Sequence, residues 1–324
     1  MLKIQNGLCF AACVATSVTL AETCPDYEVL EQLPAFTTPA QVDFEHSSNA
    51  WFSGLYTPYH LVHDQIALAN ETVTLEAKFD YSRWFHKDLE DEKVHAFIFG
   101  TGMSQWQYLG RYTTDSDGKI FVPVSKGEGE YQIRMVVEGD LSHADGYLSV
   151  VSEQRKAILF DIDGTLTLND FESVGDYLGV DKADAHYYAK ETVLEYKNKG
   201  YQIIYLTGRP YWVAKDSREW FDYMAMPQGQ LHTNPYGEGP IPEDTQAYKT
   251  EYLNRIIQDK SINIVRAYGN ASTDIAAYAD AGLPKEQTYI IGKNAGDNGT
   301  QAIADDYSYH YATQVINFES LDCN

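Results

Sequence analysis

The feature that most constrains the fold of this chain is an alternation of two patterns that begins at Lys156. Short apolar runs rich in β-branched residues have the composition of buried parallel strands; they are AILFDID, YQIIYLTG, INIVRAYG and TYIIG. Between them lie stretches with amphipathic, helix-like spacing, namely DAHYYAKETVLEYKNKG, WVAKDSREWFDYM, YKTEYLNRIIQDK and STDIAAYADAGL. The alternation predicts an α/β domain with a parallel sheet over residues 152–324. Ligands of such domains bind beyond the carboxyl ends of the strands.

The preceding residues, 22–151, have a different sequence pattern. After an irregular aromatic segment, short runs with alternating polarity follow one another from about Thr72 to Val151, separated by turn clusters such as TDSDG and SKGEGE. Strands at this spacing predict a β-sandwich domain. A chain of 324 residues is also long enough for two domains rather than one.

The overall charge and the beginning of the chain suggest partners and location. A formal net charge of −23 argues against binding to nucleic acid, because no basic stripe is available to neutralise phosphates.

Residues 1–21 have one early lysine, an apolar stretch and a T-L-A ending, which predicts a signal peptide cleaved after Ala21 rather than a membrane anchor or a core helix. The expected location is therefore outside the cytoplasm, either periplasmic or secreted.

Cysteine usage adds one expectation about the mature chain. After removal of residues 1–21 only Cys24 and Cys323 remain, at opposite ends of the sequence. Disulfides persist in oxidising compartments. We therefore predict a bridge between these two residues, the alternative being two free or intermolecular thiols.

Two aspartates stand at the end of the first apolar run of the predicted α/β domain. In a strand, side chains at i and i+2 point to the same face, so Asp161 and Asp163 are expected to converge. Two like charges about 4 Å apart repel by about 4 kcal/mol at a surface-like dielectric. A divalent cation such as Mg²⁺ would offset this repulsion. Gly164 and Thr165 would leave the strand tightly and offer backbone N–H groups to an anion. The alternative is a strand-to-turn junction with Asx-type hydrogen bonds.

The second apolar run ends in YLTGRP, which places Thr207 at a predicted strand end, followed by Gly208 and Arg209. A hydroxyl group at this position can donate to a phosphoryl oxygen, and a guanidinium group can hold negative charge nearby. Taken alone the segment is a weak signal, because threonine and glycine are common in ordinary strand-to-helix loops.

Two later segments carry similar polar groups. Lys249 lies at the start of a predicted helix, where the macrodipole disfavours a cation unless an anion faces it. Asn270 and Asp274 follow the next strand and can turn toward Asp161, which would supply oxygen ligands to Mg²⁺. Each has an ordinary alternative: a solvated lysine, and an aspartate that only caps its helix.

The ordered set of DxDGT, a strand-end threonine, a lysine at a helix start and GNxxTD resembles the haloacid dehalogenase superfamily of phosphotransferases. The segments DIDGTLTLND, YLTGRP, MPQGQLHTNP and AYGNASTDIAAYADAGLP look like the lipin family of phosphatidate phosphatases, and equally like the carboxyl-terminal domain of the large phosphatidylinositol transfer proteins. The earlier segments KDLEDEKVHAF, WQYLGRYTTDSDGKI and MVVEGDLSHADGYLSVV resemble the sandwich that precedes that domain. The resemblance covers roughly residues 72–295 and implies a Rossmann-like parallel sheet of haloacid dehalogenase type.

The resemblance implies a mechanism and a role for each residue. Asp161 would attack phosphorus and form an aspartyl-phosphate, and Asp163 would act as general acid and then as general base. Oxygen ligands would hold Mg²⁺, namely Asp161, Asp163 through its backbone carbonyl, Asn270 and Asp274. The phosphoryl oxygens would be bound by Thr207 and Lys249 and flanked by Gly164, Thr165, Gly208 and Arg209.

The resemblance leaves three functions open. The first is a Mg²⁺-dependent phosphatase that acts on phosphatidate or a related lipid phosphate, with peripheral contact to a membrane. The second is a periplasmic phosphatase for soluble phosphomonoesters. The third is a module that binds phosphatidate or a phosphoinositide without turnover. The intact DIDGT favours catalysis, because the transfer proteins alter its threonine.

Overall fold

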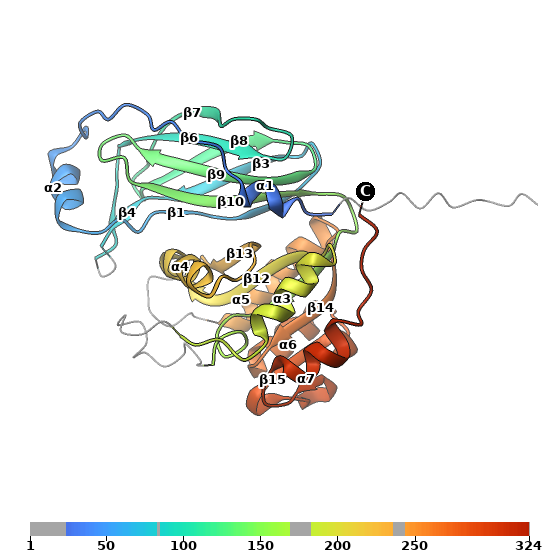
Figure 1. Ribbon diagram of the computed structural model, residues 1–324. Helices are drawn as coiled ribbons and strands as arrows, with labels where there is room; N and C mark the ends of the chain where they lie inside the picture. Colours follow the sequence, from blue (N-terminus) through green and yellow to red (C-terminus); the bar gives the residue numbers. More distant parts are fainter. Residues whose placement is uncertain (1–23, 83–84, 169–182, 236–243, 324) are drawn as a thin grey trace, which may run out of the picture.

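The protein consists of a β-sandwich seated on an α/β domain (Figure 1). The structure is a computed structural model that describes residues 24–82, 85–168, 183–235 and 244–323. The predicted signal peptide of residues 1–21 lies outside the described residues. None of the helices in the described ranges is long and apolar enough to span a bilayer.

Two sheets form the sandwich. The smaller has the order β1(Leu61–Val62), β3(Thr72–Lys78) and β8(Lys119–Ser125). The larger has the order β2(Gln65–Leu68), β10(His143–Val151), β9(Gly129–Val137), β6(Lys93–Gly100) and β7(Gln107–Thr113), and only the β2–β10 pair is parallel. Inward residues alternate with outward ones, most regularly along β8. The alternating runs predicted as strands between about Thr72 and Val151 are confirmed, and they form β3, β6, β7, β8, β9 and β10.

The sequence patterns did not reveal the shortest elements of this domain. They comprise β1, β2, β4(Asp80–Tyr81) and β5(Lys87–Asp88), together with the helices α1(Tyr27–Glu31) and α2(Ser47–Leu55). Strands of two to four residues are too short to show a period of two.

Six parallel strands make up the sheet of the α/β domain. Their order is β13(Gln230–Asn234), β12(Gln202–Pro210), β11(Lys156–Phe160), β14(Asn263–Gly269), β15(Thr288–Ile291) and β16(Gln301–Ile303). In chain order this is 3-2-1-4-5-6, the doubly wound arrangement whose strand order reverses between β11 and β14. Polar residues that follow β11, β12 and β14 therefore meet at one edge of the sheet.

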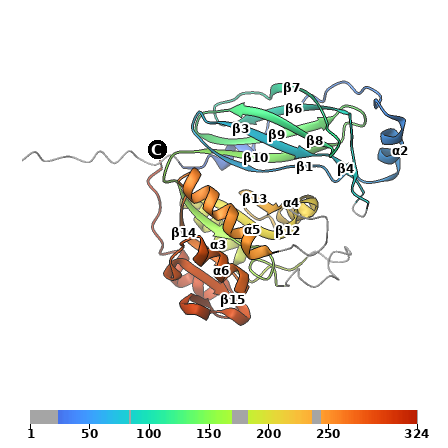
Figure 2. The same ribbon diagram turned by 180° about the vertical axis from the view of Figure 1, so that it is seen from behind.

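Helices cover both faces of this sheet (Figure 2). Side chains of β11 alternate between two cores, with Ile158 and Phe160 in one and Ala157 and Leu159 in the other. The first core includes residues of α3(Ala189–Asn198), α4(Ala214–Met224) and α7(Tyr307–His310), and the second includes residues of α5(Thr245–Asn254) and α6(Ser272–Asp280). Short 3₁₀ and π turns complete the domain: η2(Tyr211–Val213), η3(Arg255–Asp259), η4(Lys285–Gln287), η5(Gly292–Asn294), η6(Asp297–Gly299) and η7(Tyr311–Val315).

Buried polar groups join the two domains. The Asp64 carboxylate, just before β2, accepts hydrogen bonds from the backbone N–H of Tyr147 at 2.9 Å and of Leu231 at 2.7 Å, and it pairs with Arg218 of α4. Burial raises the pKa of Asp64, and the Arg218 charge and the two backbone N–H groups oppose that rise. One sandwich carboxylate thus contacts both β10 of its own domain and β13 of the other.

A second buried group at the interface is Glu130 of β9. Its carboxylate accepts a hydrogen bond from Ser149, whose hydroxyl oxygen also accepts from Gln202 at 3.1 Å and from Gln230 at 2.8 Å. Burial raises the pKa of Glu130 to about 7, against the opposing effects of Ser149, Arg155 and Gln202. The interface therefore contains an acid whose protonation depends on folding.

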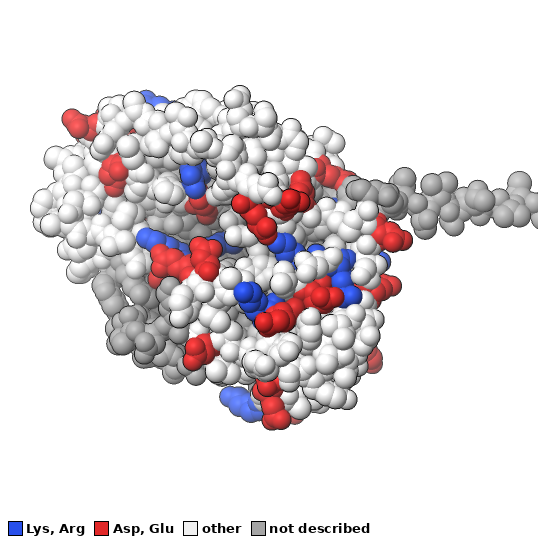
Figure 3. Space-filling view, viewed as in Figure 1, with Lys and Arg blue, Asp and Glu red and all other residues white. Residues whose placement is uncertain are grey.

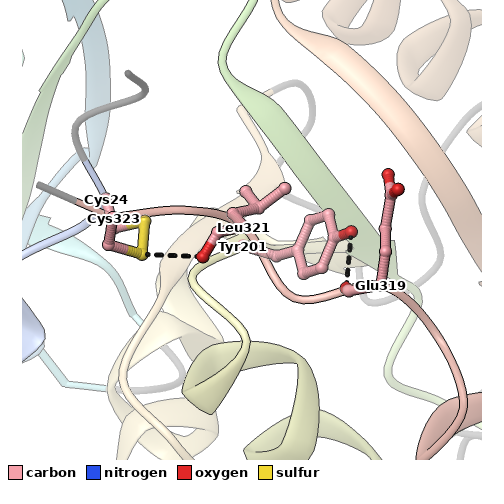
Figure 4. Close-up of a disulfide and its surroundings, with 5 residues drawn as sticks. All are labelled: Cys24, Tyr201, Glu319, Leu321 and Cys323. Carbon is pink, nitrogen blue, oxygen red and sulfur yellow. Dashed lines mark hydrogen bonds between the residues drawn. A yellow bond between two sulfur atoms is a disulfide. The ribbon is translucent and has the colours of Figure 1, made fainter.

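The two ends of the described chain are linked covalently. Cys24 and Cys323 form a disulfide with a Cα–Cα distance of 5.2 Å (Figure 4). Gly200 lies beside it with φ +88°, and a Cβ atom there would come within 2.6 Å of both sulfur atoms. The C-terminal segment is held further by the Tyr201 hydroxyl, which donates to the Glu319 carbonyl at 3.0 Å.

Candidate active site

Asp161 is the first residue after β11 and lies at the carboxyl edge of the sheet. Its backbone N–H donates to the Tyr268 carbonyl of β14 at 3.0 Å, which continues the pairing of the two strands. One carboxylate oxygen accepts from Lys249 Nζ at 2.7 Å and the other from the Thr165 hydroxyl at 2.8 Å. Only 3% of Asp161 is exposed. The side chain is therefore buried and both of its oxygens are engaged.

Lys249 connects two carboxylates from different elements. Its ammonium group donates to Asp161 at 2.7 Å and to Asp274 at 2.6 Å, and all three side chains are buried. The helix that carries it, α5, begins at Thr245, with Asp244 capping the N–H of Ala247. The prediction that Lys249 opens this helix is therefore wrong by about one turn, and the partner of its charge is a pair of carboxylates.

The pKa values of this group are displaced by burial and by mutual charge. Burial raises the pKa of Asp161 to about 7; the Lys249 ammonium opposes this effect, and the Asp274 and Asp163 carboxylates add to it. Burial by itself would lower the pKa of Lys249, but the two carboxylates outweigh it and the pKa lies above its ordinary value. We conclude that Lys249 is charged and that its charge offsets the carboxylates around it.

Asp274 is held in position by the start of α6. Its second oxygen accepts the backbone N–H groups of Asn270 and Ala271, each at 3.0 Å. Gly269 ends β14 directly against this side chain, and a Cβ atom on Gly269 would lie 2.7 Å from that of Asp274. A glycine is required here because the carboxylate packs onto the backbone. Gly269 is part of the GNxxTD motif, but its packing role was not predicted.

Asp163 has partners different from those of Asp161. Its carboxylate accepts from Arg209 Nη2 at 2.6 Å and Nε at 2.9 Å, and from the Thr207 hydroxyl at 3.0 Å. Because β11 ends at Phe160, the period of two on which the predicted convergence rested does not extend to the aspartates, and the convergence stays a prediction. Each carboxylate has its own cation, and repulsion between them is offset by Lys249 and Arg209.

The DIDGT turn uses its own polar groups. Gly164 has φ +69°, a conformation that favours glycine, and its N–H donates to the Thr167 hydroxyl at 3.0 Å. The N–H of Thr165 donates to the Ile162 carbonyl at 3.2 Å. Both N–H groups that were expected to face an anion are therefore engaged within the turn in this structure.

The carboxyl end of β12 is organised around Arg209. The backbone N–H of Arg209 donates to the Thr207 hydroxyl oxygen at 3.1 Å, and its Nη1 donates to Ser217 of α4 at 2.9 Å. Gly208 lies against the start of α5, where an added Cβ would approach Thr245 Cγ2 to 2.9 Å. Arg209, expected to flank a phosphate, thus has the Asp163 carboxylate as its partner.

Three further residues support the site and were not predicted. Ser217 fixes Arg209, Asn294 donates to the Asn270 carbonyl at 2.7 Å, and a ring nitrogen of His186 lies 3.3 Å from the Gly164 carbonyl. Burial lowers the pKa of His186. Ser217 lies in SREWF, a segment shared with the families that this chain resembles, but only proximity in the folded chain identifies the contacts of all three residues.

The oxygen-rich surroundings of Asp161 fit a hard cation. Asp161 and Asp274 already face one positive group, and the Asn270 amide oxygen lies 3.3 Å from the Thr165 hydroxyl that bonds Asp161. Carboxylate and amide oxygens are the ligands that Mg²⁺ prefers. The described residues contain no cluster of three or more His, Cys, Asp or Glu side chains that could hold a metal ion. Two carboxylates and neutral oxygens are consistent with the few protein ligands that Mg²⁺ takes.

Comparison with known proteins places both domains. Residues 58–150 match the family model "PITM 1-3, beta-sandwich domain", and residues 158–292 match "PITM 1-3, LNS2 domain". The chain belongs to this family. The resemblance to the carboxyl-terminal region of the large phosphatidylinositol transfer proteins is thus confirmed, including the sandwich that precedes the α/β domain.

Individual relatives agree with the family match. Protein retinal degeneration B of Drosophila melanogaster is 31% identical over 261 residues, which are 78% of this chain and 20% of that protein. Human membrane-associated phosphatidylinositol transfer protein 1 is 31% identical over 243 residues, covering 73% of this chain and 19% of that protein. The chain spans about a fifth of the length of these curated relatives. A solved phosphoserine phosphatase in apo form covers 43% of this chain and 86% of its own, with 17% identity, but its TM-score of 0.29 carries no argument.

The relatives correct one prediction. They are named as membrane-associated proteins, and the expectation of an exported, periplasmic or secreted protein is wrong. That expectation rested on an apolar stretch from Leu8 to Ala21. Apolar stretches of about 10–14 residues occur in several kinds of segment, so their hydrophobicity by itself does not define a location.

Proposed function

We propose that this chain is a Mg²⁺-dependent phosphomonoester hydrolase of haloacid dehalogenase type, acting on phosphatidate or a related lipid phosphate. The observation that carries the proposal is the buried group of Asp161, Lys249 and Asp274 at the carboxyl edge of the sheet, where the strand order reverses. Ligands of doubly wound sheets bind at this point. Burying charged groups away from water costs folding free energy, and such groups are often found at functional sites.

The chain's own residues supply the steps of the reaction. An oxygen of Asp161 attacks phosphorus while the bond from phosphorus to the ester oxygen breaks, which leaves an aspartyl-phosphate. The carboxyl group of Asp163 gives its proton to the leaving alkoxide. Water then attacks the aspartyl-phosphate, its proton passes to Asp163, and the bond from phosphorus to Asp161 breaks to release inorganic phosphate.

The acid role of Asp163 requires its pair with Arg209 to open. The pair is bidentate, and the Thr207 hydroxyl also donates to the same carboxylate. A phosphoryl group is a comparable partner for a guanidinium and a hydroxyl group. Transfer of Arg209 and Thr207 from Asp163 to the substrate would free the acid as the phosphoryl group is bound.

Asp161, Asp274, Asn270 and the backbone carbonyl of Asp163 are the groups that would hold Mg²⁺, which when bound screens the charge of the transferring phosphoryl group. Lys249 opposes the rise in the pKa of Asp161 that burial causes, and its hydrogen bonds orient Asp161 and Asp274. Thr165 holds the other Asp161 oxygen.

The choice of a lipid phosphate is supported by the family. The relatives are named as membrane-associated phosphatidylinositol transfer proteins, and their matched segments correspond to both domains of this chain. A lipid substrate and peripheral membrane contact are consistent with those names. A phosphatase for soluble phosphomonoesters would use the same residues and is separated from the first proposal by the assay below.

The second candidate function is binding of phosphatidate or a phosphoinositide without turnover. The observation that favours it is the Arg209–Asp163 pair, because a carboxylate held by a guanidinium group is not placed to protonate a leaving group. The intact DIDGT sequence favours catalysis.

The test measures phosphate release from phosphatidate in mixed micelles and from a soluble aryl phosphate, each with and without Mg²⁺. Asp161→Asn is the test variant and Asp259→Asn, an exposed aspartate of the same domain, is the control. Mg²⁺-dependent release from phosphatidate, lost only in Asp161→Asn, supports the lipid phosphatase. Release from the aryl phosphate alone supports the soluble-substrate phosphatase. Binding of phosphatidate without release from either ester refutes catalysis and leaves the binding module.

A further inference from the structure

One end of the sandwich exposes large apolar side chains on α2. Trp51 and Leu55 are four residues apart and therefore share a face of this helix, and they are 58% and 59% exposed. The half-buried Phe52 and Tyr56 anchor the helix, with ring centroids 5.6 Å apart, and the Trp51 ring lies 5.0 Å from that of Phe52. The stacked rings of Phe52 and Tyr56 thus pack beneath the helix, and Trp51 and Leu55 point to solvent.

Phe85, which precedes β5, extends this surface. Phe85 is 69% exposed, and its ring packs edge-on against Tyr56 with centroids 5.9 Å apart. Figures 1 and 2 both place α2 and β4 at the same end of the sandwich. We call the exposed side chains of Trp51, Leu55 and Phe85 the aromatic edge.

The helix α2 itself carries no formal charge, although Glu45 precedes it and Glu92 accepts a hydrogen bond from its Asn49. Residues 46–63 contain no Asp, Glu, Lys or Arg, although the chain carries 47 acidic and 24 basic residues. In Figure 3 the rim of the molecule over α2 is correspondingly uncoloured. The aromatic edge is therefore one place where a strongly acidic protein can approach an anionic surface without an acidic helix facing it.

The aromatic edge is connected to the candidate active site by side-chain contacts. His86 follows Phe85, and its ring lies 5.1 Å from that of Trp212 in η2. Trp212 comes three residues after Arg209, which binds Asp163. A surface bound at the aromatic edge would therefore lie beside the loop that forms one wall of the site.

We propose that the aromatic edge is a reversible docking surface for the interface of a phospholipid bilayer. Trp and Phe side chains prefer the boundary between headgroups and acyl chains, and a few of them suffice for reversible binding. A stable protein dimer buries about 1,200 Å² or more in total. A fully buried aromatic side chain contributes about 150–250 Å². Since these three are only 58–69% exposed, the six side chains of two copies would bury roughly 500–950 Å² in total, which falls short of a dimer interface. The proposal concerns binding and does not depend on turnover.

The experiment measures co-sedimentation of the full chain with vesicles of phosphatidylcholine that contain a minor fraction of phosphatidate. Burying one anchoring side chain is worth about a factor of ten in affinity. We expect Trp51→Ser to weaken binding about tenfold, and the triple variant Trp51→Ser, Leu55→Ser and Phe85→Ser to abolish it. The control is Tyr309→Ser, since Tyr309 is 75% exposed on α7 of the other domain. An unchanged unfolding midpoint shows that each variant is folded.

Three results would overturn the proposal: vesicle binding that survives in the triple variant, wild-type protein that does not sediment with vesicles, or a wild-type dimer that Trp51→Ser dissociates. The last would assign the aromatic edge to a second copy of the chain. Vesicle binding that the triple variant loses, without phosphate release, would instead refute the proposed hydrolase and support the docking surface, so the two proposals fail separately.

Discussion

Replacement of Lys249 by methionine tests the centre of the candidate site. The substitution keeps most of the side-chain volume but removes the cation that Asp161 and Asp274 share at 2.7 and 2.6 Å. Lys249 is 3% exposed and Asp274 is 1% exposed, so water cannot replace the lost hydrogen bonds without rearrangement. Removing one partner of a buried ion pair costs about 3–5 kcal/mol. We expect Lys249→Met to lower the free energy of unfolding by this amount.

The assay is urea unfolding at neutral pH, with and without Mg²⁺. Lys119→Met is the matched control, because Lys119 pairs with Glu76 at 2.8 Å while both side chains are about one third exposed. Such surface pairs contribute about 0–1 kcal/mol. Mg²⁺ can take the place of the missing ammonium group. Saturating Mg²⁺ should therefore raise the free energy of unfolding of Lys249→Met by about 1–3 kcal/mol and that of the wild type by less.

A double variant separates charge from packing. Adding Asp274→Asn to Lys249→Met removes one of the two unpaired carboxylates, so the double variant should be more stable than Lys249→Met alone. The reasoning is refuted if Lys249→Met loses no more stability than Lys119→Met. It is also refuted if the double variant is less stable than either single variant, because the loss would then come from packing.

Two further predictions follow from other buried contacts. Gly269→Ala should displace the Asp274 carboxylate and lower the free energy of unfolding by about 1–3 kcal/mol. The control is Gly54→Ala in α2, which should be neutral or slightly stabilising because no atom lies within 4 Å of the added Cβ. Chemical denaturation compares the two variants, and equal effects would contradict the close-packing argument. Burial raises the pKa of Glu130 from 4.5 to about 7, so its contribution to stability is fully present below pH 4.5 and is lost as the pH rises through about 7. Over that pH range the free energy of unfolding of the wild type should fall by up to about 3 kcal/mol relative to that of Glu130→Gln. Unfolding experiments at about pH 5 and pH 7.5 measure this difference. If the free energies of unfolding of the two proteins change with pH in the same way, the pKa of Glu130 is not raised.

Much of the fold could be predicted from local patterns. Each long strand and each amphipathic helix appears in the sequence as a period of two or a helical spacing, because those periods depend only on neighbouring residues. The strands β13 and β16 were missed. QLHTN has a histidine and polar ends, and QAI is three residues long, so neither resembles a buried strand. Both are strands because adjacent strands supply their hydrogen bonds.

The sequence by itself determined which side chains would meet at the edge of the sheet. Asp161 follows β11 and Thr207 lies near the carboxyl end of β12, while Lys249 lies about one turn inside α5 and Asp274 in the first turn of α6. A doubly wound sheet brings these positions together. The tertiary structure decided which of them pair. It placed Lys249 between Asp161 and Asp274 and turned Asp163 to Arg209.

The contacts between the domains were also decided only in the folded chain. Asp64 precedes a strand too short to detect, and Glu130 lies in a strand whose pattern does not reveal that its outer face is covered. The physical reason is common to all these cases. A local period specifies which face of an element is apolar, whereas the partner of a buried charge is chosen by whichever element packs against it, often more than a hundred residues away along the chain.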